Sequence, residues 1–233
     1  MLNEKGSMSI LTVFTLAAVI MGSVYLFYFF TAFIEKRQAQ NIADASSLAA
    51  VQVLRDKFEE EMEKKTFDTL DEFLNAEIPD EYDKLTDEPP PDFEQFKNDY
   101  IDDKIQTAEL AGKLKSGTYD HDEDWLLIVK EPYFRHEYTA SKNGEILYEA
   151  FLRYSAEIGD AARTAAILNH GKSEGKITFP DEGKPKLLTE AARIIKIGGI
   201  GLEQEMKAAA ASGIGSSQFD IDVGSKSPRT IYW

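Results

Sequence analysis

A stretch of 29 residues without a charged side chain, Gly6 to Ile34, constrains this 233-residue chain more than any other feature of its sequence. As an α-helix it would be about 43 Å long at roughly 1.5 Å per residue, whereas the hydrocarbon core of a bilayer is about 30 Å thick. The run predicts one transmembrane helix, which we place at residues 10–34, after a short N-terminal head at residues 1–9. A cleaved signal peptide is the alternative, but its apolar region would be only about 7 to 15 residues long.

The far end of the charge-free run is rich in aromatic residues, which favour the headgroup region of a bilayer. These residues are Tyr25, Phe27, Tyr28, Phe29, Phe30 and Phe33. The flanking charges do not decide the orientation, because Lys5 lies on one side of the run and Lys36 and Arg37 lie on the other. The residues alone therefore predict a single-pass membrane protein and leave its direction open.

The helical pattern continues beyond the predicted span. No Gly or Pro occurs from Glu35 to Lys65, and apolar residues recur there at intervals of three or four. The recurring residues are Leu48, Val51, Leu54, Phe58 and Met62. This period predicts one continuous helix from about residue 7 to 65, in which residues 35–65 form a stalk in water.

Small residues also recur at intervals of four along this helix. The pairs are Ala18 with Gly22, Ala39 with Ala43, Ala45 with Ala49, and Ser46 with Ala50. Such spacing lets helices approach closely, and within lipid this close packing drives helix association. We therefore expect self-association or association with other subunits through the N-terminal helix. For the part in water, Ala residues on an ordinary buried face are an equally good interpretation.

A distinctive motif follows the predicted span: Gln40-Asn41-Ile42-Ala43-Asp44-Ala45-Ser46-Ser47-Leu48-Ala49-Ala50. Together with Glu4-Lys5-Gly6 before the span, this motif resembles the N-terminal region of TadE/TadG-like proteins of the Tad (Flp) pilus-assembly family. The resemblance covers residues 4–52. Leu11 stands where pilins that are processed after such a Gly carry Glu, so the resemblance is to the uncleaved TadG-like branch.

The resemblance implies a pilin-like or minor-pilin-like subunit of the cell membrane, with its N-terminus in the cytoplasm and its C-terminal domain extracytoplasmic. The implied partners are other pilus-assembly or secretion-system subunits. It implies a helix-packing role for Ala18, Gly22, Gln40, Asn41, Ala43, Asp44, Ala45, Leu48, Ala49 and Ala50. On the residues alone a solvated Asp44 is the simpler interpretation, whereas the resemblance favours hydrogen bonds from Gln40, Asn41 and Asp44 that fix the register of neighbouring helices.

The formal net charge of −15 belongs to one segment of the chain. Residues 56–124 hold 24 acidic and 8 basic side chains, a net of −16, so the remainder is nearly neutral. Phosphate binding requires clustered Lys and Arg, and this excess of acid excludes nucleic acid as a partner. The absence of Cys excludes disulfides, thiolate zinc sites and cysteine nucleophiles.

Within the acidic middle we predict a helical linker segment at residues 66–118. Thr69 and Glu72 have the spacing of a capping box, which predicts a short helix that Pro79 closes. Residues 80–92 are dense in charge and proline and predict an extended linker. Residues 93–108 predict a second amphipathic helix, with Gly112 and Gly117 marking its exit. A solvated spacer is the simplest interpretation of this charge, and a calcium-binding or partner-docking surface is the alternative.

One acidic cluster has the spacing of a calcium loop. Asp120, Asp122, Asp124 and Glu131 take the first, third, fifth and twelfth positions of an EF-hand-like sequence. The sixth position is Trp125, where the turn requires Gly, and the strand-forming residues after it would carry Glu131 away from the three Asp. We therefore assign no metal site here.

Residues 119–233 predict an α+β globular head with an antiparallel sheet and packed helices. We expect strands at 125–129, 133–140 and 146–154, with Asn143-Gly144 as a hairpin turn. We expect helices at 157–169, 186–197 and 202–212, each followed by Gly. Residues 219–223 and 231–233 are further strand candidates.

No constellation for catalysis or cofactor binding emerges from the sequence. His121, His136 and His170 have no Ser or Asp at motif spacing. Gly171-Lys172-Ser173 has the end of a P-loop, but Ala166 stands where its first Gly belongs. We therefore predict that the chain is not an enzyme and holds no cofactor.

Two hypotheses follow. The first is a non-enzymatic membrane-anchored component of a Tad/Flp-type (type IV-like) pilus or related secretion apparatus, which assembles through its N-terminal helix. The alternative is a membrane-tethered extracytoplasmic binding or sensor module, for which the helix is only an anchor.

Overall fold

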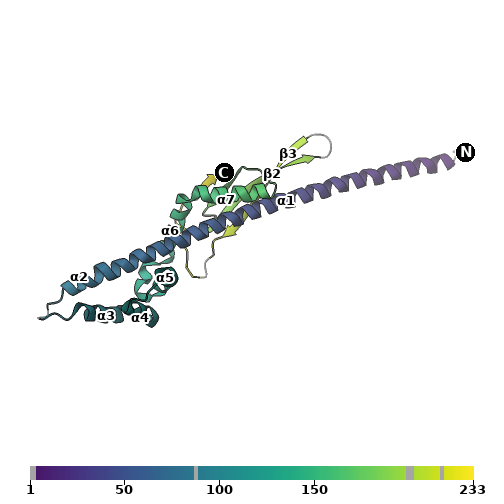
Figure 1. Cartoon of the computed structure of the whole chain (residues 1–233). Helices are drawn as coiled ribbons and strands as arrows, with labels where there is room; N and C mark the ends of the chain where they lie inside the picture. Colours follow the sequence, from purple (N-terminus) through teal and green to yellow (C-terminus); the bar gives the residue numbers. More distant parts are fainter. Residues whose placement is uncertain (1–3, 87–88, 198–201, 216–217) are drawn as a thin grey trace.

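One helix runs through most of the structure. The computed structural model describes residues 4–86, 89–197, 202–215 and 218–233, and its first element, α1 (Glu4–Glu72), is 69 residues long. A π-helical turn, η1 (Phe73–Glu77), joins α1 to α2 (Ile78–Asp83) without a break. The N-terminal part of α1 protrudes from a body that packs against the rest of it (Figure 1). The prediction of one continuous helix over residues 7–65 is confirmed, and the helix is longer than predicted.

Two predicted boundaries near the end of this helix are wrong. Thr69 does not open a new helix, because it lies inside α1 and its Oγ1 donates to the carbonyl of Lys65 at 2.8 Å. Pro79 does not close a helix but lies in the first turn of α2. Proline is well tolerated there, since the first turn of a helix has no intrahelical partner for its missing N–H.

The body is built around the C-terminal part of α1. Three helices contact α1 directly: α5 (His121–Lys130), α6 (Ala140–Arg153) and α7 (Ser155–Leu168). Leu54, Phe58 and Met62 of the predicted apolar series are buried in this core and Val51 is partly buried, whereas Leu48 is exposed. The predicted helix at 157–169 is confirmed as α7.

A four-stranded antiparallel sheet covers one side of these helices. Its strands are β1 (Gly175–Phe179), β2 (Lys186–Ile197), β3 (Leu202–Gly213) and β4 (Arg229–Tyr232), in the order β3-β2-β1-β4. α1 contacts β2 and β3, while α7 contacts β1 and β4. The predicted α+β class with an antiparallel sheet is confirmed, as is the return of residues 231–233 to the sheet, although most strands come from other residues than predicted.

The predicted hairpin at 125–154 is wrong. These residues form α5, the 3₁₀ helix η2 (Pro132–Glu137) and α6. The Thr139 side chain accepts from the Lys142 N–H and caps α6, so Asn143 and Gly144 lie inside its first turns instead of forming a hairpin turn. Asn143 is buried, and its Nδ2 donates to the carbonyls of Tyr138 and Asp220.

Gly144 is required by close packing rather than by a turn. A Cβ added there would lie 1.8 Å from the carbonyl oxygen of Asp222, whose own N–H donates to the Ala140 carbonyl at 2.9 Å. Residues 219–223, expected as a strand, instead form this loop against the start of α6. Asn-Gly is thus compatible with a hairpin turn or with a closely packed helix, and the contact with Asp222 decides between them.

The predicted helices at 186–197 and 202–212 are also wrong, because these residues are β2 and β3. Both segments ended near glycines that we interpreted as helix caps, and residues 198–201 lie outside the described residues. Leu187, Thr189 and Ala191 alternate into the buried side of the sheet, a period-2 pattern typical of a strand. Pairing with β2 along its whole length and contact with α1 override the helical preference of the Ala-rich β3.

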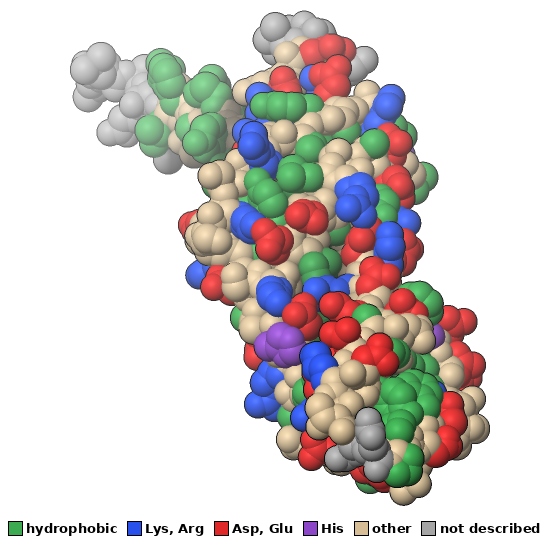
Figure 2. All heavy atoms as spheres, turned by 90° about the vertical axis from the view of Figure 1, so that its left-hand side faces the viewer, with side chains coloured by type: hydrophobic (Ala, Val, Ile, Leu, Met, Phe, Trp, Pro, Cys, Tyr) green, Lys and Arg blue, Asp and Glu red, His purple; other side chains and the backbone are tan. Residues whose placement is uncertain are grey.

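The acidic middle folds back beside the C-terminal part of α1. It contains α3 (Phe93–Lys104) and α4 (Ala108–Ser116), so the single helix predicted for residues 93–108 is interrupted at residues 105–107. Gly117 ends α4 in the left-handed conformation with φ of 67°, whereas Gly112 lies inside that helix. Acidic side chains are spread over this end of the molecule (Figure 2).

Three residues of the calcium-like spacing have structural partners. Asp120 caps α5 by accepting from the Asp122 N–H, and Asp124 accepts from Lys113 Nζ at 2.5 Å. Glu131 is fully buried and accepts from the backbone N–H groups of Gln106 and Thr107, each at 3.0 Å. Burial raises the pKa of Glu131, but hydrogen bonds from the Thr107 side chain and from the backbone N–H groups outweigh it and hold the pKa below its ordinary value.

Gly144→Ala should destabilise the protein by about 1 to 3 kcal/mol, because the new methyl group collides with backbone of the 219–223 loop. Gly112→Ala is the matched control, since a Cβ there meets nothing within 4 Å and should stabilise α4 by about 0.5 to 1 kcal/mol. Urea unfolding of the detergent-solubilised chain measures both changes. A stabilised Gly144→Ala variant would contradict the packing described for α6.

Glu131→Gln should cost about 1 to 3 kcal/mol at neutral pH, since the charged acceptor is lost. The folded pKa of Glu131 is lowered from 4.5, so its contribution is present above about pH 4.5 and is lost as the pH falls through the folded pKa. Unfolding of the variant should accordingly depend less on pH in the acid range than unfolding of the natural chain. Glu174→Gln, at a largely exposed position, should leave the pH dependence unchanged. Equal pH dependence of all three proteins would contradict this assignment.

Candidate functional site

The N-terminal part of α1 has no cover from the body. Every side chain described from Ile10 to Ile34 is exposed, and this is the one helix, among the described residues, that is long and apolar enough to cross a membrane. The very next residue, Glu35, already contacts the body, because its carboxylate lies 3.4 Å from Nε of Arg193 on β2. The apolar segment and the body therefore adjoin without a spacer.

Small residues after this point pack inside the protein. Ala39, Ala43, Ser46, Ser47 and Ala50 are buried on one face of α1. Ala43 is fully buried in a cluster that includes Ala166 of α7, Ala191 of β2 and Ala210 of β3. Because these side chains are single methyl groups, a helix and two strands can approach α1 closely. In the part of α1 outside the apolar segment, this face packs against the protein's own body.

Polar contacts fix the position of the β2–β3 pair along the axis of α1. Nε2 of Gln40 donates to the Ala209 carbonyl at 3.1 Å, and Oγ of Ser47 donates to Oγ of Ser212 at 2.8 Å. Arg193 also donates to Gln38. The sequence does not reveal the contacts among Glu35, Gln38 and Arg193, because nothing in it pairs residues that lie about 155 positions apart.

The opposite face of the same segment is exposed. Asn41, Asp44 and Leu48 point away from the core at intervals of three and four, and Leu48 has 64% of its surface exposed. Gln40 Nε2 donates to Oδ1 of Asp44 at 3.0 Å, which is a contact within α1. Ala45 and Ala49 are partly buried between the two faces. We call Asn41, Asp44 and Leu48 the outer stripe.

Comparison with known proteins bears on this same segment. Residues 6–53 match the family model "Putative Flp pilus-assembly TadE/G-like". This chain carries a TadE/G-like N-terminal segment. No curated protein and no solved structure matches the chain. The matched residues comprise the apolar segment and the part of α1 up to residue 53, which packs against the body. The rest of the body lies outside the match.

The TadE/G-like segment includes a second pair of small residues, Ala18 and Gly22, on the protruding part of α1. Ala18 is exposed, and a Cβ added at Gly22 would meet nothing within 4 Å. The structure therefore leaves the surface at these two residues open to another helix. Their predicted role in helix packing stays a prediction.

The three histidines lie apart. His121 on α5 contacts the Glu63 carbonyl of α1 at 3.0 Å, His136 is exposed on η2, and His170 follows the end of α7 with φ of 63°. The contact of His121 with Glu63 joins α5 to α1. In the part of the chain that the structure describes, no group of three or more His, Asp or Glu side chains is arranged to hold a metal ion.

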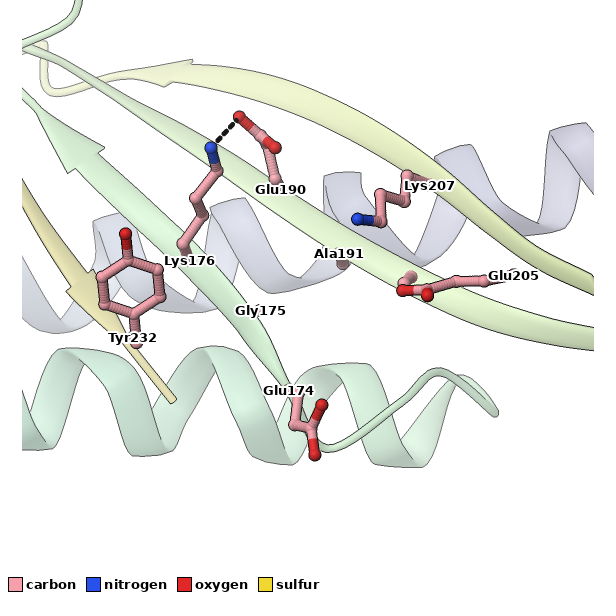
Figure 3. Close-up of a pocket in the computed structure, with 9 residues that line it drawn as sticks. Glu174, Gly175, Lys176, Glu190, Ala191, Glu205, Lys207 and Tyr232 are labelled. Atoms are coloured by element: carbon pink, nitrogen blue, oxygen red, sulfur yellow. Dashed lines mark ion pairs between the residues drawn. The ribbon is translucent and has the colours of Figure 1, made fainter.

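A hollow lies on the outer face of the sheet (Figure 3). It is lined by Glu174, just before β1, and by strand residues that include Lys176, Glu190, Glu205 and Lys207. Lys176 and Glu190 face each other across β1 and β2 and form an ion pair of 2.8 Å. This partner raises the pKa of Lys176, which keeps its amine protonated and unsuited to act as a nucleophile.

Ala43→Leu should destabilise the body by about 1 to 3 kcal/mol, because four alanines meet at this point and leave no room for a longer side chain. Leu48→Ala, on the outer stripe, should change stability by less than about 0.5 kcal/mol. Thermal unfolding followed by circular dichroism distinguishes the two faces. Equal stability of the two variants would contradict the assignment of one buried and one outer face.

Proposed function

We propose that this protein is a non-enzymatic, single-pass membrane component of a Tad/Flp-type pilus or related secretion apparatus. One observation carries the proposal. The TadE/G-like segment is a single helix in two parts. Residues 10–34, the apolar rod, are exposed, whereas the following residues bury one face in the body and expose the outer stripe on the other. Such a division suits a subunit that is anchored by its helix and assembles along it.

The arrangement of the two parts supports a pilin-like mode of assembly. The exposed apolar rod offers its whole circumference, and Ala18 and Gly22 provide a place where a second helix can approach closely in lipid. In the body, Ala39, Ala43 and Ala50 are already occupied by α7 and the sheet. Partner contacts outside the membrane are therefore assigned to the outer stripe and not to the small-residue face.

The side chains of the outer stripe are suited to fixing the register between the helices of neighbouring subunits. Asn41 and Asp44 offer an amide and a carboxylate one helical turn apart, and Leu48 adds an exposed apolar side chain one turn further. Isolated polar groups in an otherwise apolar helix contact fix register, because a shifted pairing leaves them without hydrogen bonds. The partners in this proposal are other pilus-assembly or secretion-system subunits, or further copies of the chain.

We place the N-terminus in the cytoplasm and the body on the extracytoplasmic side, as the family resemblance implies. The strongly acidic end of the body, formed by residues 56–124, then lies at the far end from the apolar rod. This position keeps its charge away from an anionic membrane surface.

Leu48→Ala combined with Asp44→Ala should abolish most co-purification of this protein with other components of the apparatus, because the outer stripe loses its apolar and polar contacts. Leu152→Ala is the matched control, since Leu152 is an exposed leucine on α6 outside the TadE/G-like segment. Affinity capture of the full-length protein from solubilised membranes measures both. Unchanged capture with correct folding would favour the tethered binding or sensor module instead.

A further inference from the structure

Some exposed apolar side chains of the body lie at the end where α1 leaves it. Among the described residues after Ile34, large hydrophobic side chains are exposed at Leu48, Phe67, Leu152, Ile167, Leu168, Ile194 and Tyr232. Ile167 and Leu168 lie at the end of α7. Ile194 lies on the outer face of β2, because Ala191 and Arg193 on the other face contact α1. Leu168 has 74% of its surface exposed, which is high for a leucine in a folded body.

The end of α7 lies close to the start of the body. α7 runs antiparallel to α1, because Glu157 near its beginning pairs with Lys57 while Ala166 near its end packs with Ile42 and Ala43. Leu168 and His170 share a hollow with Gln38 and Arg193. Leu168 is therefore within roughly 10 Å of Ile34 along the helix axis, at about 1.5 Å per residue of α1.

The β2–β3 pair reaches further still. Ser212 contacts Ser47 and Ala209 contacts Gln40, so β3 runs in the same direction as α1 and its earlier residues lie toward the apolar rod. On β2, Arg193 already contacts Glu35, and each following residue advances by about 3.3 Å. Ile194 thus lies level with the last residues of the apolar rod, and in Figure 1 the strand pair continues past this level at an angle to α1.

The length of the apolar rod sets the position of the membrane surface. The charge-free run measures about 43 Å, and a bilayer including both headgroup layers measures about 40 to 45 Å. Its last turns carry Phe29, Phe30 and Phe33, whose rings suit the headgroup layer. Glu35 is then at the outer edge of that layer, and the body begins there.

Charge supports the same placement. Lys36 and Arg37 are exposed on α1 at this edge, where they can meet lipid phosphates. The excess of acid lies in residues 56–124, toward the opposite end of the body. An anionic surface would therefore attract this end and repel the other.

We propose that the body rests on the bilayer that its own helix crosses, through a lipid-facing rim of Lys36, Arg37, Ile167, Leu168 and Ile194. The occupant of this rim is phospholipid, in the headgroup layer and the first part of the acyl chains. The inference rests on the proposed function only in that α1 spans a membrane. It adds that the body is seated on the lipid and does not stand clear of it.

The absence of Cys makes a direct test simple, because each labelled position can carry the protein's single thiol. Leu168→Cys and Ile194→Cys are labelled with an environment-sensitive NBD dye in the full-length chain, with Leu152→Cys as the matched exposed control. The proteins are reconstituted into phosphatidylethanolamine and phosphatidylglycerol vesicles, with and without lipids that carry a doxyl quencher near the headgroup. Circular dichroism verifies that the labelled chains retain the fold.

The rim predicts blue-shifted emission at positions 168 and 194 and at least a twofold loss of intensity with doxyl lipid, against little change at position 152. Equal and weak quenching at all three positions, in chains that float with the vesicles, would overturn the lipid-facing rim and leave the proposed function intact. A blue shift at 168 and 194 that doxyl lipid does not quench, and that grows with protein density, would overturn it in favour of contact between copies. Chains that fail to float with vesicles would overturn the membrane span and the rim together.

Discussion

The position of the body on α1 depends on a contact among four alanines. Ala43, Ala166, Ala191 and Ala210 belong to one buried cluster, which brings α1, α7, β2 and β3 together. Larger side chains would separate these elements, so the small size of the residues determines how closely the sheet lies on the helix. The contacts of Gln40 and Arg193 then fix the position of the sheet along the axis of α1. Since Ala43 lies within the TadE/G-like segment, that short sequence contains both the apolar helix and the residue against which α7, β2 and β3 pack.

The long helix was predictable because its signals are local. Absence of charge predicts a membrane helix, and apolar residues at intervals of three and four predict that the helix continues. Leu54, Phe58 and Met62 are buried as this pattern requires. The face that carries Ala39 and Ala43 was also visible, but the sequence could not decide whether another subunit or the same chain would cover it. The structure assigns that cover to α7 and the sheet.

The body was harder to predict because its decisive contacts join distant residues. Asn143-Gly144 has the composition of a hairpin turn, yet Thr139 caps a helix there and the carbonyl of Asp222 occupies the space beside Gly144. The Ala-rich β3 has a helical composition, and its pairing with β2 and contact with α1 make it a strand. Glu35 and Arg193 illustrate the same limit at the candidate site, since neither residue is unusual until the fold joins them.

In the proposed arrangement one unbroken helix passes from lipid into water, so a tilt of its membrane part also tilts the body. From Glu35 to Asp83 the helical path is about 70 Å long at 1.5 Å per residue, with only the π-helical turn at Phe73–Glu77 to interrupt its regularity. A tilt of the membrane segment by about 20°, an ordinary value for such helices, would carry the far end of the body sideways by roughly 25 Å. A small change in the tilt of the membrane segment would therefore displace the acidic end of the body by a large distance. A force applied to the acidic end would likewise tilt the membrane segment.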